Sequence, residues 1–326
     1  MTQTLAPIAA YDILPDGTAR ALSDPWPDAE PAPDAIWRWM HFERTDPGFV
    51  AWSAEHLPAP VRAALLQAET RPHCDAIGDG LLVTLRGMNL NPGQAEEDMV
   101  SLRLWIRANL VVTARLRRVF PMDDLRREIA EGRATASPAA FVARLADLVT
   151  ERIETASSAR EDLLDGIEEA LLDDESEALA AHTTEIARLA RSVIKLRRHI
   201  APQREALNRL AGIEAAFLTS PSRYALRHAA NRTTRAVEEL DTVRDRLTAL
   251  RTHIDSLQTA RLGRNGFILS VVAVVFLPLS FLTGLFGMNV AGIPGTVWPW
   301  AFATLSLAMM LLGLGLWVIL RWRNWF

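Results

Sequence analysis

Residues 265–320 read NGFILSVVAVVFLPLSFLTGLFGMNVAGIPGTVWPWAFATLSLAMMLLGLGLWVIL and include no Asp, Glu, Lys, Arg or His. The 326-residue chain has 35 Lys and Arg and 39 Asp and Glu, and all of them lie outside this stretch. A helix needs about 20 apolar residues to span a bilayer. The stretch is therefore too long for one span, and too long without charge for the core of a soluble domain. It predicts a C-terminal segment in a lipid bilayer, joined to a soluble part.

A turn interrupts the uncharged stretch. Residues 289–299, NVAGIPGTVWP, contain two glycines and two prolines, a composition typical of turns. We therefore expect a first transmembrane helix at 267–288, an outer loop at 289–297 and a second transmembrane helix at 298–320.

Arginines flank this pair of helices on one side only. Arg261 and Arg264 precede the first span, Arg321 and Arg323 follow the second, and the loop has no charge. The positive-inside rule then predicts that both chain ends lie in the cytoplasm, with 321–326 as a cytoplasmic tail. A multi-pass protein of the cell inner membrane is the expected location.

The rest of the chain has the features of a cytoplasmic domain. Its net charge of −4 argues against nucleic acid as a partner, since such proteins present a basic face. Cys74 is the only cysteine, so an intrachain disulfide is excluded. The N-terminus, MTQTLAPIAAYDILPDG, has neither a basic region nor a long apolar run, and so does not resemble a secretory signal.

The soluble part has two regions that differ in amino-acid composition. Residues 1–136 predict an α/β domain, because short alternating apolar runs are separated by turn residues. From about Ser137 the sequence is rich in Ala, Leu, Glu and Arg, so 137–266 predicts long cytoplasmic helices that form a stalk. The expected elements are strands at 36–42 and within 78–89, a hairpin at 99–116 that turns at Ala108–Asn109, short helices at 48–56 and 60–68, and long helices at 138–172, 176–218 and from Ser222 onward.

The last long helix carries two stripes at heptad spacing. The apolar stripe consists of Leu240, Val243, Leu247, Leu250, Ile254 and Leu257, which predicts packing on other helices or on copies of itself. The second stripe is acidic or hydroxylic in the soluble part and mostly small in the membrane. From the residues alone, two interpretations stand level: a pore lining, or a solvated face above a tight helix-packing face. Its members are Asp241, Asp245, Thr248, Thr252, Asp255, Thr259, Gly263, Gly266, Ser270, Ala273, Leu277, Ser280 and Gly284, with Gly287 in continuation.

The sequence offers no catalytic constellation. It has no phosphate-binding loop, serine-nucleophile motif or paired metal-ligand helix, so we expect neither an enzyme nor a bound cofactor. The densest acidic run, between Glu161 and Glu177, is either a solvated helix face or a surface that concentrates cations.

Several motifs resemble one transporter family. Gly287-Met288-Asn289, at the end of the first span, resembles the signature of the CorA-type divalent metal ion transporters. The longer string FLPLSFLTGLFGMNVAGIPG (276–295) is more similar to the ZntB zinc-transporter branch. RGMNLNPG (86–93), EDMVSLRLWI (97–106) and SSAREDLLDGIEEALL (157–172) are also similar to that branch, so the resemblance covers nearly the whole chain.

This resemblance implies a funnel-shaped homopentamer with one axial pore lined by the long helix of each copy. It implies that Asn289 forms the selectivity ring at the outer mouth and contacts the metal through hydration waters. Gly287 and Met288 would hold the loop that presents Asn289. The transported substrate would be zinc or another divalent cation, and the zinc branch implies coupling to protons.

Two features of this chain bear on which ion it would transport and leave alternative functions open. Magnesium-type members commonly carry an acid in the outer loop, where this chain has Ile293-Pro294-Gly295, which favours zinc. Zinc, however, prefers nitrogen and sulfur ligands, and the spans offer none. A magnesium channel of the same fold and a membrane-anchored coiled-coil scaffold therefore remain alternatives.

Overall fold

The computed structural model describes residues 7–22, 26–173, 179–288, 293, 295 and 298–322. The chain forms two compact units, Met1–Arg251 and Thr252–Phe326. The finer boundaries expected at 136/137 and at the ends of the spans remain predictions.

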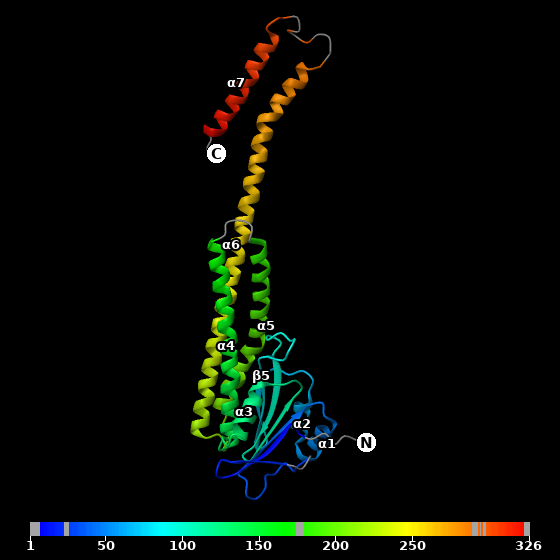
Figure 1. The fold of residues 1–326 in the computed structure, drawn as a ribbon, viewed down its shortest axis with the longest axis vertical. Helices are drawn as coiled ribbons and strands as arrows, with labels where there is room; N and C mark the ends of the chain where they lie inside the picture. Colours follow the sequence, from blue (N-terminus) through cyan, green and yellow to red (C-terminus); the bar gives the residue numbers. More distant parts are fainter. Residues whose placement is uncertain are drawn as a thin grey trace. The chain divides into compact units, whose positions relative to one another are not determined.

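A seven-stranded sheet is the centre of the first unit (Figure 1). Its strand order is β2-β1-β3-β7-β6-β5-β4, and only the β3–β7 pair is parallel. The strands are β1 (Ala9–Ile13), β2 (Ala19–Ala21), β3 (Trp37–Glu43), β4 (His73–Ile77), β5 (Gly80–Gly87), β6 (Val100–Ile106) and β7 (Leu110–Arg115).

The longer strands lie where the sequence predicts them. β3, β5 and the β6–β7 hairpin confirm the expectations, and Gly78, at a φ of +58°, supplies the left-handed residue of the turn before β5. β1, β2 and β4 were not predicted, because each has five residues or fewer and none has an extended β-branched run.

Helices cover both faces of the sheet. α1 (Pro47–His56) and α2 (Ala59–Leu66) confirm the two expected short helices and pack over a core that includes Phe42 and Trp105. The opposite face packs against α4 (Pro138–Asp173), where Phe141 lies 5.7 Å from Trp37 and 5.0 Å from Trp39 between ring centroids. α3 (Phe120–Ala130) was not predicted; it precedes α4 and packs against it.

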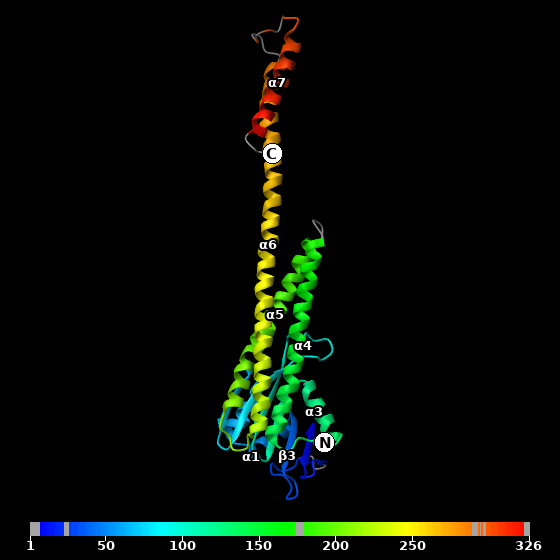
Figure 2. The same ribbon diagram turned by 90° about the vertical axis from the view of Figure 1, so that its left-hand side faces the viewer.

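Three long helices follow as expected: α4, α5 (Leu179–Gly212) and α6 (Ser220–Phe286). Within the first unit they run side by side along the sheet (Figures 1 and 2). The predicted end of α5 at Leu218 is wrong, because the helix stops at Gly212, a poor helix former. α6 then begins behind Thr219, whose Oγ1 accepts a hydrogen bond from the Ser222 backbone N–H at 3.4 Å.

The apolar stripe of α6 packs in the first unit as predicted. Leu240, Val243 and Leu247 are each at most 2% exposed. Burial of such side chains stabilises the fold by roughly 1.5–3 kcal/mol each. This part of the stripe is therefore a seam within the chain, whereas Leu257 at the end of the stripe is 47% exposed.

The second unit consists of the C-terminal part of α6 and α7 (Ala301–Trp322). Among the described residues, α6 and Ala301–Ile319 of α7 contain stretches long and apolar enough to cross a membrane. Neither apolar stretch is buried inside the chain, unlike the core helix of a soluble protein. Gly313 of α7 faces α6, and a Cβ there would lie 3.9 Å from Leu279 Cδ1. α7 starts three residues after the expected Trp298.

Candidate functional site

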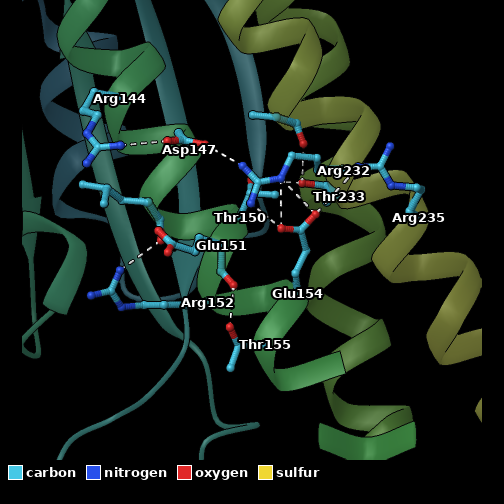
Figure 3. A network of polar contacts seen from close by, with 12 residues as sticks. Arg144, Asp147, Thr150, Glu151, Arg152, Glu154, Thr155, Arg232, Thr233 and Arg235 are labelled. Atoms are coloured by element: carbon cyan, nitrogen blue, oxygen red, sulfur yellow. Dashed lines mark hydrogen bonds and ion pairs between the residues drawn. The ribbon is translucent and has the colours of Figure 1, made fainter. Parts of the chain in front are cut away.

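A network of ion pairs fixes the first part of α6 to α4 (Figure 3). The Arg232 guanidinium donates to Asp147 Oδ1 at 2.6 Å and to both carboxylate oxygens of Glu154. Thr150 and Thr233 add a buried hydroxyl contact at 3.2 Å. Because Arg232 is largely buried and meets two carboxylates, the network holds the α6 register more firmly than an exposed ion pair could.

The first residue of the polar stripe lies against a neighbouring helix. Asp241 accepts from Arg197 of α5, with Nη2 3.1 Å from Oδ2. Hydrogen bonding to Arg197 holds the pKa of Asp241 below its usual value of 3.8, and Arg244 lowers it further. The structure thus places Asp241 in a helix–helix contact, whereas the carboxylate of Asp245 is 70% exposed.

The acidic run of α4 is partly neutralised by α6. Arg246 donates to Asp165 Oδ1 at 2.6 Å and to Glu168 Oε2 at 2.5 Å, and lies 4.0 Å from Glu161. Hydrogen bonds to Glu168 and Asp165 raise the pKa of Arg246. Three acids of the run therefore belong to the packing of α4 on α6, while residues 174–178 lie outside the described chain.

The remainder of the stripe is open along α6. All of its members except Asp241 and Ala273 are exposed, and Leu277 reaches 68% exposure. Three of its hydroxyls donate back into the helix: Thr248 to Arg244 O at 2.9 Å, Thr259 to Asp255 O at 2.8 Å, and Ser270 to Gly266 O at 2.9 Å. A hydroxyl that donates its hydrogen to a backbone carbonyl in this way presents its oxygen lone pairs outward. Such a surface can accept hydrogen bonds from the water shell of a cation.

The glycines of the stripe fall into two groups. A Cβ at Gly263, Gly266 or Gly284 would meet nothing within 4 Å, so the fold of the chain does not itself require small residues there. A Cβ at Gly287 would lie 2.8 Å from Thr283 O, the same oxygen that accepts the Gly287 backbone N–H at 2.9 Å. Gly287 therefore follows α6 in a geometry that has no room for a side chain.

The rest of the expected filter is described only in part. Met288 is 48% exposed, and Asn289 lies outside the described residues. The same three letters at Gly87-Met88-Asn89 serve a structural purpose: Asn89 is 1% exposed, and its Oδ1 accepts from Asn91 Nδ2 at 2.8 Å in the turn after β5.

One residue beside the stripe, Pro278, was not singled out from the sequence. Pro278 lies inside α6, one position from Leu277. Because proline has no N–H, the carbonyl of Val274 loses its helical donor, and a bend is expected at this height. The bend could have been predicted from the sequence, since a proline in an apolar helix leaves a backbone carbonyl without its helical hydrogen-bond donor.

Among the described residues, no group of three or more His, Cys, Asp or Glu side chains could hold a metal ion. The exposed face of α6 instead offers neutral oxygens and single carboxylates. This chemistry suits a cation that keeps its water rather than one stripped to direct ligands.

Comparisons with known proteins agree on one relationship. Residues 34–321 match the family described as CorA-like Mg2+ transporter protein. The chain is 33% identical over 289 residues to the zinc transport protein ZntB of Yersinia enterocolitica, covering 88% of this chain and 87% of that protein. It is 36% identical over 278 residues to the divalent cation transporter CmaX of Pseudomonas aeruginosa, covering 84% and 82%. The solved full-length CmaX structure superposes with a TM-score of 0.84 at 32% identity and covers 98% of each chain.

Proposed function

The chain belongs to the family of CorA-like Mg2+ transporter proteins, and we propose that it transports divalent metal cations, with zinc as the main substrate. Members of this family are transporters and not enzymes. The polar and small-residue stripe of α6 carries the proposal, because it forms a continuous exposed face that leads to Gly287. A membrane-anchored scaffold has no need of such a face.

Zinc is favoured by the relatives. A protein named for zinc transport is 33% identical over most of the chain, and the outer loop lacks the acid that would attract cations to the mouth. Because the described residues hold no cluster of zinc ligands, the ion passes with its water shell, and Asn289 selects through that shell. Magnesium is the second candidate, since this ion gives up water reluctantly and suits the same surface.

A homopentamer provides the pore. The described residues of one chain include two helices apolar enough to cross a membrane, which are too few to enclose a water-filled path, so several copies must place the α6 stripe around one axis. Arg261, Arg264 and Arg321 support an inner-membrane orientation with both ends in the cytoplasm. Mass measurement of the detergent-solubilised protein is expected to give five copies, and a monomer would contradict the pore.

The membrane potential drives uptake. A potential of 100 mV is worth about 2.3 kcal/mol per elementary charge, so a divalent cation gains roughly twice that on entry. Coupling to protons has to run through water, because residues 265–320 contain no titratable side chain of the acidic, basic or histidine type. Zinc flux into liposomes that responds to a pH gradient at fixed potential supports coupling to protons. Zinc flux that does not change with the gradient contradicts such coupling.

Substitution of the proposed filter tests the function. Asn289→Ala removes the amide oxygen and nitrogen and should abolish zinc flux or its preference over magnesium in liposomes, with the oligomer intact. Asn109→Ala is the control, because that amide donates to Glu30 Oε2 at 2.7 Å in the exposed β6–β7 turn. Wild-type flux and selectivity in Asn289→Ala would place the filter elsewhere, whereas absent flux in every variant would favour a scaffold.

A further inference from the structure

A second site lies in the first unit, away from the α6 stripe. A cavity of about 200 Å³ opens beside the end of α2, and four arginines line it: Arg44, Arg86, Arg103 and Arg117. Asp98 is the one acid of its lining, and this carboxylate is paired with Lys195 at 3.1 Å. The cavity is therefore lined mainly by positive charge.

The sheet register brings these arginines together. Arg86 on β5 pairs with Ser101 on β6, so the two side chains share a face of the sheet. Arg103 lies two residues after Ser101, and because side chains alternate along a strand, it lies on the same face of the sheet. Arg44 directly follows β3 and donates its backbone N–H to Arg115 O at 2.7 Å, which places it at the same end of the sheet.

The partners of the buried arginines are neutral. Arg44 Nη1 donates to Leu66 O at 2.8 Å and Arg103 Nη2 to Gln67 O at 2.7 Å, both at the C-terminal end of α2. Arg86 donates to Thr70 O at 2.8 Å and to Met99 O at 2.9 Å. Throughout the described chain, these three arginines have no carboxylate within ion-pair distance, in contrast to Arg232. Carbonyls orient the guanidinium groups without neutralising them, and the carboxylate of Glu69 offsets the charge of Arg86 only from beyond ion-pair distance.

The cluster also has unused donors. Arg103 is only 2% exposed, and its Nε is buried without a hydrogen-bond partner. The Nε atoms of Arg44 and Arg86 are in the same condition within the described residues. A buried donor without a partner is costly, above all on a charged group, so an acceptor from outside the chain would stabilise this arrangement.

The shared positive charge lowers the pKa values of groups in and beside the cluster. Burial, followed by the charges of Arg44 and Arg86, lowers the pKa of Arg103 to about 10. Burial and the charges of Arg86 and Arg198 lower the pKa of His199 to about 4. An anion between these groups would reverse the repulsion.

We propose that this cavity binds a phosphate-type oxyanion. Guanidinium groups match the oxygen spacing of phosphate and donate charge-assisted hydrogen bonds to it. At about 30 Å³ per water, the cavity has room for a phosphate group and several waters. An adjoining cavity of about 910 Å³ shares Ala68 and Arg86 and is also lined by Arg71, Arg198 and His199. The source of the phosphate is therefore either the free ion or a nucleotide whose remaining part occupies this larger space.

Calorimetric titration of the purified full-length protein in detergent tests the site, with inorganic phosphate and ATP as separate probes in a phosphate-free buffer. We expect saturable binding of one molecule per chain. Arg103→Gln should weaken it at least tenfold, because the buried charge is lost. Arg117→Glu should do the same without risk to the core, since Arg117 is exposed at the rim.

Arg107→Ala is the matched control. Arg107 lies just beyond the other end of β6, outside the cavity lining, and pairs with Asp79 at 2.8 Å, so its removal should leave affinity within twofold of wild type. Binding of ATP that phosphate displaces supports a nucleotide in the same site, and binding of phosphate alone supports the free ion. Absence of saturable binding by both probes, or unchanged affinity in Arg117→Glu, overturns the proposal.

Discussion

Arg197 of α5 and Asp241 of α6 form a two-pronged ion pair, with Nη2 3.1 Å from Oδ2. Asp245, one turn further along the same stripe, is paired within the described chain only with its neighbour Arg244, at 2.9 Å. The acidic part of the stripe is therefore divided: Asp241 joins two helices, and the exposed face begins at Asp245.

This division predicts different effects of two matched substitutions. Asp245→Asn removes an exposed charge from the proposed pathway and should slow divalent cation flux at low ionic strength, with less effect in high salt. Asp241→Asn should keep flux within twofold and lower stability by up to about 1 kcal/mol, the scale of a partly exposed ion pair. Liposome flux and thermal melting of the two proteins separate these effects. Equal loss of flux in both variants would show that Asp241 also faces the pathway.

The Arg232 network predicts a larger loss of stability (Figure 3). Arg232→Met leaves Glu154 without its main partner, while Asp147 keeps Arg144 at 2.8 Å, and the change should cost about 2 kcal/mol. Arg235→Met is the control, since Arg235 is 61% exposed and lies 4.0 Å from Glu154. Its effect should stay within about 0.5 kcal/mol. The midpoints of thermal unfolding of the two full-length variants in detergent give both effects. Equal midpoints would contradict the conclusion that Arg232 anchors α6 to α4.

How far the sequence predicts the structure depends on the range of the interaction. Long periodic helices such as α4 and α6 are predictable because their apolar spacing repeats over many turns. β1 is not, because its five residues become a strand only through pairing with β3. The arginine cavity was also missed, since Arg44, Arg86 and Arg103 meet only once the sheet register is known. In the stripe, periodicity identified the face, but only the structure shows that Asp241 contacts α5.

The end of α6 provides a prediction about backbone geometry. In Gly287→Ala, the new methyl group would lie 2.8 Å from Thr283 O, so the segment after α6 must shift and flux should fall at least tenfold. In Gly284→Ala, the new methyl group would have no described atom outside its own helical turn within 4 Å. This substitution should therefore preserve folding, and any loss of flux in this variant reports narrowing of a pore or a clash between copies. Flux assays with parallel measurement of oligomer mass distinguish these results. Normal flux in Gly287→Ala would mean that the geometry after α6 does not matter for transport.

The α4–α6 contact predicts a stability that depends on pH. Burial, followed by the negative charges of Glu161 and Glu154, raises the pKa of Glu239 above its usual value of 4.5. The folded state then holds a proton that the unfolded state has already lost, so this group makes the protein less stable as the pH rises from 4.5 through the raised pKa. Once the pH exceeds both values, the charged carboxylate remains a constant penalty. Glu239→Gln should therefore raise the thermal midpoint at pH 7.5, because relief of like-charge repulsion adds roughly 0.5 kcal/mol to the free energy of unfolding.

The pH profile distinguishes this cause from a general effect of charge removal. The advantage of Glu239→Gln over wild type should shrink as the pH falls and vanish below 4.5, where Glu239 is protonated in both the folded and the unfolded state. Glu238→Gln is the matched control, because it removes the same charge from the adjacent, exposed position. Thermal unfolding of the three proteins between pH 4 and pH 8 gives the comparison. A gain for Glu239→Gln that persists unchanged at pH 4, or an equal gain for Glu238→Gln, would mean that repulsion among Glu239, Glu161 and Glu154 is not its source.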